Sequence, residues 1–140
     1  MKDRKFSSFR FGKQRVPEIY TAIAISFDKN ADIEQIKTEL KIIGISDIKI
    51  EAPKCSNELD VVVFETRSKN DWYLNDVISK MFSNMNCSIN ELGEIITKHN
   101  GNTYIDIAFW HYKTYPALEI SKENIKKINL LNASLGIDPY

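Results

Sequence analysis

The sequence predicts an α+β protein built on a ferredoxin-like antiparallel sheet, and three observations support this class. Segments that alternate apolar and polar residues are interspersed with segments whose apolar residues recur at helical spacing. The segments follow the split βαβ order, strand–helix–strand–strand–helix–strand, in which the second helical position holds one or two helices. A strand–helix unit comes after them. The 140 residues suit one domain. We therefore expect helices packed on one face of the sheet and a C-terminal strand–helix extension.

The first strand and helix are expected within residues 19–43. The strand, residues 19–27, places its larger side chains on one side: Ile19, Thr21, Ile23, Ile25 and Phe27. Its other side carries mostly small residues, so we expect a central strand that is covered on both faces. Asn30 or Asp32 then provides the N-cap of a helix with an apolar stripe from Ile33 to Ile43, which Gly44 ends.

Two further strands are expected at residues 48–52 and 60–66. The first alternates isoleucine with charged residues, and the second, DVVVFET, is a run of β-branched residues bounded by a turn. Strict alternation along this second strand would place Asp60 and Glu65 on opposite faces of the sheet.

Helical spacing resumes near Asp71 and is interrupted around Asn86. Ser88 and Glu91 have the spacing of a capping box, so we expect two consecutive helices or one helix with a break. The helical pattern ends near His99, where an imidazole at the C-terminus of a helix would interact well with the dipole. Residues 103–112 then alternate as a strand.

The last 25 residues predict a short strand at 117–120 and a helix capped by Ser121. Four apolar residues recur at helical spacing and mark the expected buried stripe: Ile125, Ile128, Leu131 and Leu135. A final short strand at residues 136–140 is an open alternative.

A set of C-terminal residues also carries a family resemblance: Pro116, Leu118, Ile120, Ser121, Glu123, Ala133, Ser134, Leu135, Ile137, Asp138 and Tyr140. With the stretch DWYLNDVISKMFSNMN, this pattern resembles the bacterial domain-of-unknown-function family four-two-seven-nine, over most of residues 58–140. Pro139 departs from the family pattern, so the last strand is expected to be short or at an edge. The resemblance implies a small bacterial cytoplasmic protein and contributes no catalytic residue.

Charge divides the chain into a basic N-terminal arm at residues 1–16 and a single α+β domain at residues 17–140. The arm carries +5 and the remaining residues carry −5. Five cations of the arm are the candidate nucleic-acid contacts: Arg4, Lys5, Arg10, Lys13 and Arg15. A basic tail is a weaker indication than a basic domain face, so we expect no nucleic acid partner. An extra edge strand or a disordered tail are the other interpretations of the arm.

Composition favours a cytoplasmic protein without a membrane segment. No apolar run approaches the roughly 20 residues that span a bilayer, and no apolar segment follows the basic N-terminus as in a signal peptide. Cys55 and Cys87 stand apart from each other and from any histidine, so we expect free thiols and no metal site.

Residues 104–115 hold the candidate binding site. It combines four aromatic residues with one carboxylate and one histidine: Tyr104, Asp106, Trp110, His111, Tyr112 and Tyr115. Tyrosine and tryptophan are frequent anchors of protein interfaces, and three of the four rings share one face of the expected strand. The sequence leaves two alternatives open, a recognition patch at the surface or core residues covered by helices.

The sequence contains no nucleophile elbow, phosphate loop or dinucleotide-binding motif, so we expect no cofactor and no enzymatic activity. The first hypothesis is a protein-binding module, with an immunity protein that neutralises a toxin as its specific form. The alternatives are a small-ligand or enzymatic pocket lined by Asp106, Trp110 and His111, and nucleic-acid binding through the arm. Homo-oligomerisation is compatible with each of them.

Overall fold

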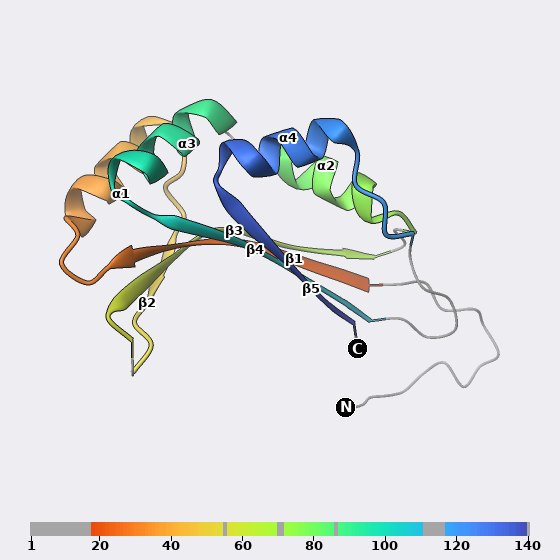
Figure 1. Cartoon of the computed structure of the whole chain (residues 1–140), viewed down its shortest axis with the longest axis horizontal. Helices are drawn as coiled ribbons and strands as arrows, with labels where there is room; N and C mark the ends of the chain where they lie inside the picture. Colours follow the sequence, from red (N-terminus) through yellow and green to blue (C-terminus); the bar gives the residue numbers. More distant parts are fainter. Residues whose placement is uncertain (1–17, 55, 70–71, 86, 111–116, 140) are drawn as a thin grey trace.

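In the described part of the chain, four helices cover one face of a five-stranded sheet (Figure 1). The computed structural model describes residues 18–54, 56–69, 72–85, 87–110 and 117–139. The strands are β1 (Glu18–Asp28), β2 (Lys49–Glu51), β3 (Glu58–Lys69), β4 (Asn102–Trp110) and β5 (Ala133–Pro139). The helices are α1 (Ile33–Ile42), α2 (Leu74–Asn84), α3 (Ile89–Lys98) and α4 (Lys122–Leu130).

The strand order is β2-β3-β1-β4-β5, with β1 at the centre. β1 is antiparallel to both β3 and β4, and β2 is antiparallel to β3. These four strands have the order and directions of the split βαβ pattern. β5 extends the sheet beyond β4 as a parallel edge strand that the chain reaches through α4. The predicted α+β class is thus confirmed.

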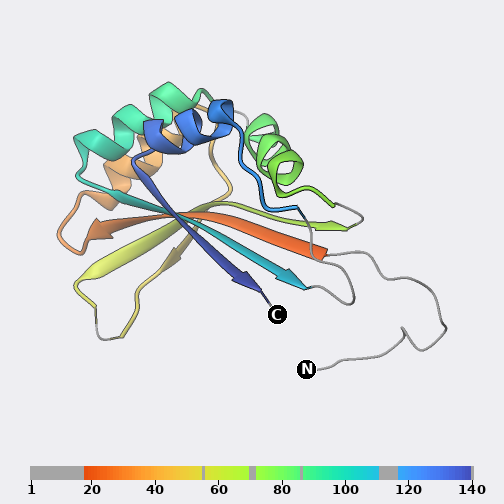
Figure 2. The ribbon, with the colours of Figure 1, turned by 45° about the vertical axis from the view of Figure 1, so that its right-hand side comes forward.

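The hydrophobic core lies between the sheet and the helices because alternate residues of β1 and β4 point toward the helices. Seven large apolar residues of these two strands are at most 2% exposed: Ile19, Ile23, Ile25, Phe27, Ile105, Ile107 and Phe109. On the other side of β1, Tyr20, Ala22 and Ala24 are half-buried, and no helix of the described residues lies over them (Figure 2). The expectation that β1 is covered on both faces is therefore wrong, although its central position is right.

Local capping explains where three helices begin. The side chains of Asp32, Ser88 and Ser121 each accept a hydrogen bond from a backbone N–H in the first turn. These bonds satisfy donors that have no partner inside the helix. The helical region predicted after Asp71 forms two separate helices, because α2 ends at Asn84 and α3 begins at Ile89.

The helices pack closely side by side where α3 meets α4. A Cβ atom added at Gly93 of α3 would lie 2.4 Å from the backbone oxygen of Leu130 at the end of α4. This distance is too short for any side chain that has a Cβ atom, so the close contact between α3 and α4 requires glycine at this position. α4 is also tied to α2 by Asn124, which is 2% exposed and donates to the Asn75 Oδ1 at 2.8 Å and to the Ser79 Oγ at 2.9 Å.

Two sequence predictions for the segment around α4 are wrong. Residues 117–120 do not form a strand of the sheet, because Ala117 makes an isolated bridge with Tyr73, at the entry to α2. Ile125 does not lie in the buried stripe, since it is 54% exposed. The buried position of this turn belongs to Asn124.

The end of α4 also differs from the predicted helix. α4 ends at Leu130, Asn132 adopts a left-handed conformation with φ 52°, and β5 begins at Ala133. Leu135 therefore packs against the core from a strand. The alternative of a C-terminal strand is the right one, and this strand is longer than predicted and lies at the edge, as Pro139 indicated.

None of the helices in the described ranges is long and apolar enough to cross a membrane. Cys87 is a free thiol whose pKa is raised by burial and by the nearby Glu91 carboxylate. Cys55 lies outside the described residues.

Candidate functional site

The face of the sheet opposite the helices, here called the open face, gathers aromatic and charged side chains from four strands. The residues of interest are Tyr20, Glu65, Arg67, Tyr104, Asp106, Trp110 and Asp138. Strand register places them together: Ala22 lies between Glu65 and Asp106, and Tyr20 lies between Arg67 and Ala108. Because alternate residues of a strand point to opposite faces, the apolar core positions and these residues come from the same strands.

A β-bulge in β3 determines which charges reach the open face. Ile23 pairs with Phe64, but the next residue of β1, Ala24, pairs with Val62, so Val63 is the additional residue. An additional residue reverses the alternation beyond it. Asp60 and Glu65 consequently lie on the same face, where strict alternation predicted opposite faces, and that prediction is wrong.

Glu65 is the centre of a polar cluster that joins β1, β2 and β3. Its carboxylate lies 2.6 Å from the Lys49 Nζ and accepts a hydrogen bond of 2.5 Å from the Tyr20 hydroxyl. The Lys49 ammonium, followed by the Tyr20 hydroxyl, lowers the pKa of Glu65. Burial, followed by the hydrogen bond to Glu65, raises the pKa of Tyr20 to about 12. Tyr20 is therefore a hydrogen-bond donor fixed in place, and its phenol stays neutral.

Arg67 connects a carboxylate with an aromatic ring at one end of the open face. Its guanidinium lies 3.2 Å from the Glu18 Oε1 and over the Trp110 ring, 5.5 Å from the ring centroid. This distance suits a cation–π contact. Glu18 is the direct neighbour of Trp110 on the adjacent strand, so the three side chains form one group.

The half of the open face that β4 and β5 form is acidic and aromatic. Tyr104 is 43% exposed, and Asp106 follows two residues later on the same side. Asp138 of β5 projects on this side beside Ala108, because parallel pairing sets Asp106 against Gly136 and Ala108 against Asp138. Burial, followed by the charge of Asp138, raises the pKa of Asp106.

Of the residues predicted for the site, the structure places Tyr104, Asp106 and Trp110 on the open face, with Tyr104 and Asp106 exposed to solvent. The alternative in which helices cover this face of β4 is therefore rejected for the described residues. The five candidate nucleic-acid contacts of the arm and three residues of the candidate binding site cannot be placed, because they lie outside the described residues: Arg4, Lys5, Arg10, Lys13, Arg15, His111, Tyr112 and Tyr115.

Sequence reasoning missed four residues of the open face: Tyr20, Glu65, Arg67 and Asp138. Tyr20 stood out as the one large residue on a strand side that otherwise carries Ala and Ser, and that contrast was the available signal. Asp138 was identified only as part of the family pattern, and the sequence did not indicate its position on the open face. Glu65 and Arg67 required the bulge and the pairing of β3 with β1, which no local pattern shows.

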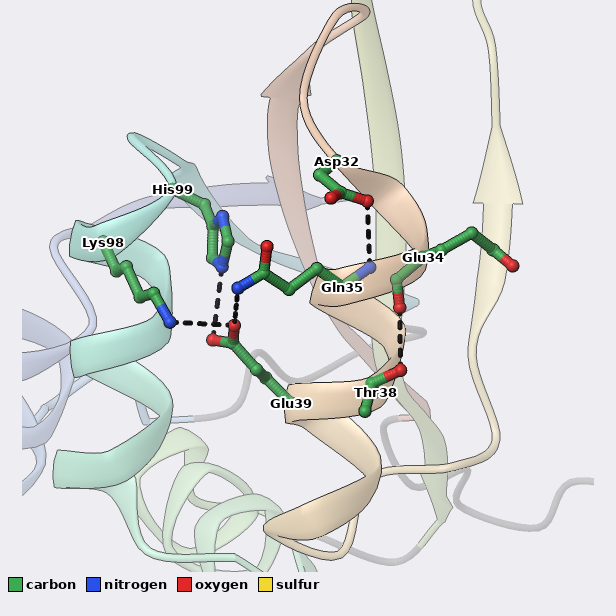
Figure 3. Close-up of polar contacts among 7 residues, drawn as sticks. All are labelled: Asp32, Glu34, Gln35, Thr38, Glu39, Lys98 and His99. Atoms are coloured by element: carbon green, nitrogen blue, oxygen red, sulfur yellow. Dashed lines mark hydrogen bonds and ion pairs between the residues drawn. The ribbon is translucent and has the colours of Figure 1, made fainter.

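His99 belongs to a separate polar cluster between α1 and α3 (Figure 3). As predicted, it occupies the C-terminal cap of α3. Its Nε2 lies 3.2 Å from the Glu39 Oε1, and the other carboxylate oxygen lies 2.9 Å from both the Lys98 Nζ and the Gln35 Nε2. The Lys98 ammonium is the main group that lowers the pKa of Glu39. This cluster fastens two helices together and lies on the helical side of the sheet, away from the open face.

Three surface cavities occur elsewhere on the molecule. One of about 430 Å³ lies between α1 and β2, one of about 640 Å³ lies beside Gly93 and Leu130, and one of about 330 Å³ lies beside Tyr73 and Ile120. None of these three is lined by Asp106. Across the described ranges, no three His, Cys, Asp or Glu side chains converge as metal ligands would.

Comparison with curated proteins and with solved structures gives no match for this chain. A family model does match residues 54–140, which include β3, β4, β5 and three of the helices. The matched region comprises more than half of the chain and includes both acidic residues of the β4–β5 half of the open face. The chain therefore belongs to the family described as Domain of unknown function (DUF4279).

Proposed function

We propose that this chain is a non-enzymatic module that binds another protein through the open face of its sheet. The observation that carries the proposal is the grouping of Tyr20, Tyr104, Trp110 and Arg67 on a face that no described helix covers. Tyrosine, tryptophan and arginine are the residue types that dominate the energetics of protein interfaces. The hydrogen bond of Tyr20 to Glu65 and the ion pair of Arg67 with Glu18 hold these two side chains in place, which lowers the entropy that binding would cost.

The position of Asp106 supports binding rather than catalysis. A general base acts on a substrate that a concave site holds within hydrogen-bond reach. Asp106 instead lies on an extended sheet face and lines none of the three cavities described above. A raised pKa on such a surface fits a carboxylate that a partner contacts.

A specific form of this proposal is an immunity protein that neutralises a toxin inside the bacterial cytoplasm. The net charge of −5 outside the N-terminal arm would favour a basic partner, because complementary charge increases the association rate and the specificity. The free thiol of Cys87 fits a reducing compartment.

Crosslinking in the native cells tests the proposed surface. A tagged full-length chain is compared with the double variant Arg67→Ala/Tyr104→Ala and with the control double variant Ile125→Ala/Lys126→Ala on exposed positions of α4. We expect a specific protein whose recovery falls about tenfold or more with the first variant and stays constant with the control. Equal recovery with both variants, or no specific protein at all, would reject the proposed surface.

The immunity form has its own test. Each protein encoded beside this gene is expressed with and without the full-length chain, and growth is recorded. We expect one neighbour to arrest growth and the chain to relieve that arrest, with the Arg67→Ala/Tyr104→Ala variant relieving it less. Neighbours that leave growth unchanged would reject the immunity form.

A further inference from the structure

Two carboxylates of the open face, Asp106 and Asp138, form no ion pair with a cation of the described residues. Asp106 of β4 and Asp138 of β5 are close enough for the charge of Asp138 to raise the pKa of Asp106. Within the described ranges, neither carboxylate forms an ion pair with a lysine, arginine or histidine. Two like charges beside each other, one of them partly desolvated, favour the arrival of a positive group.

Two cations of the open face, Lys49 and Arg67, are already engaged by other groups. Lys49 binds Glu65 at 2.6 Å, and Arg67 binds Glu18 at 3.2 Å while it lies over Trp110. The carboxylates that bind these two cations lie on β1 and β3, and only the Trp110 ring belongs to β4. The β4–β5 half therefore presents negative charge to a partner.

One aromatic ring and open space accompany the two carboxylates. Tyr104 is 43% exposed and precedes Asp106 by two residues on the same side of β4. Aromatic rings attract cations electrostatically, most strongly where water is displaced. Gly136, directly beside Asp106, carries no side chain, and a Cβ atom there would lie only 3.3 Å from the Asp106 Oδ1. Glycine thus leaves room next to the carboxylate.

We propose that the partner is a protein with a basic segment, and that one of its lysine or arginine side chains lies between Asp106 and Asp138 against the Tyr104 ring. This inference rests on the proposed function, because it names the chemistry of the partner at the same surface. The segment's cation satisfies both carboxylates, and its backbone follows the exposed side of β4 and β5.

Peptide selection on the immobilised full-length chain tests the inference. Peptides are selected from a randomised display library, and one selected peptide is synthesised for affinity measurements at low and high salt. We expect enrichment of lysine or arginine, and an affinity that falls with ionic strength as charge screening increases. Asp106→Asn and Asp138→Asn should each weaken the selected peptide about tenfold or more.

Two further variants make the measurement selective. Gly136→Val should weaken the peptide, because it fills the space beside Asp106, while valine suits a strand and keeps the fold. Asp76→Asn removes the same charge from an exposed position of α2 and should leave the affinity unchanged. Unchanged affinity in both Asp106→Asn and Asp138→Asn, or selected peptides without enriched cations, would overturn the inference.

The same measurements separate this inference from the proposed function. If Tyr104→Ala abolishes peptide binding while both aspartate variants bind normally, the open face remains the docking surface and the cation assignment fails. If Tyr104→Ala also binds normally, both the cation assignment and the proposed docking surface fail. A synthetic peptide of residues 1–16, which carry +5, is the comparison for an internal occupant. Tighter, aspartate-dependent binding of that peptide would overturn the assignment to a foreign partner.

Discussion

The two faces of β4 differ in solvent exposure and in the chemistry of their side chains. On the covered face, Ile105, Ile107 and Phe109 are at most 2% exposed and pack under the helices. On the open face, the intervening residues Tyr104 and Asp106 are exposed. Alternation along one strand thus separates the residues that hold the fold from the residues available for contacts. Mutations on the two faces should therefore have separable effects on stability and on binding.

The largest expected effect comes from the covered face. Ile107→Ala should lower the free energy of unfolding by about 2–5 kcal/mol, because it removes a fully buried side chain and leaves a cavity. Chemical denaturation of the full-length chain measures this difference. Tyr104→Ala, three residues earlier on the open face, is the control and should change the stability by less than about 1 kcal/mol. Equal losses in the two variants would contradict the separation of the faces.

The glycines offer a second comparison, between the helix layer and the open face. Gly93→Ala should lower the free energy of unfolding by about 1–3 kcal/mol, because its Cβ atom would meet the Leu130 backbone oxygen at 2.4 Å. That loss exceeds the gain of about 1 kcal/mol that alanine brings to a helix. Gly136→Ala is the matched control, since its nearest contact is the movable Asp106 side chain at 3.3 Å. A Gly93→Ala variant with the thermal stability of the wild type would mean that α3 and α4 can separate at little cost.

The smallest expected effect is the pH dependence contributed by the open face. Because the pKa of Glu65 is lowered in the folded state, chiefly by Lys49, its ionised form stabilises the fold above the pKa of the unfolded state. This contribution disappears as the pH falls through the lowered pKa. The Glu65→Gln variant should therefore be less stable than the wild type near about pH 7, and the difference should shrink on acidification.

The size of that difference is limited by solvent, since the side chains of Lys49 and Glu65 are 65% and 33% exposed. We expect less than about 1 kcal/mol at neutral pH. Urea denaturation of both proteins across the acid range measures it. Asp106→Asn is the contrasting variant, because the raised pKa of Asp106 means that its ionised form opposes folding. A loss of stability at neutral pH in Asp106→Asn would contradict this sign.

Local chemistry made part of this fold predictable from the sequence. Asp32, Ser88 and Ser121 cap helices through bonds to residues three positions away, so short segments contain the whole signal. The end of α4 was ambiguous, because the local pattern fits two structures. Leu131 and Leu135 fit a helix, while Ala133, Leu135 and Ile137 fit a strand. Asn132, which tolerates the left-handed conformation, marked the true boundary.

The candidate site was predictable only along β4. Tyr104, Asp106 and Trp110 follow from alternation within one strand, but their neighbours come from strands that are distant in the sequence. Glu65 reached the open face through the bulge at Val63, and Asp138 through the parallel pairing of β5 with β4. Register of this kind depends on tertiary packing and on the whole sheet, which a single strand does not specify.

The central position of β1 has a consequence for synthesis of the chain. β1 leaves the ribosome before the other described strands, yet its partners along one edge end at Lys69 and along the other at Trp110. Until both have emerged, an apolar strand rich in isoleucine has at least one unpaired edge, which is a template for aggregation. The sheet can close only after most of the chain has been made, so slow translation between β3 and β4 prolongs the time during which a chaperone would protect this strand.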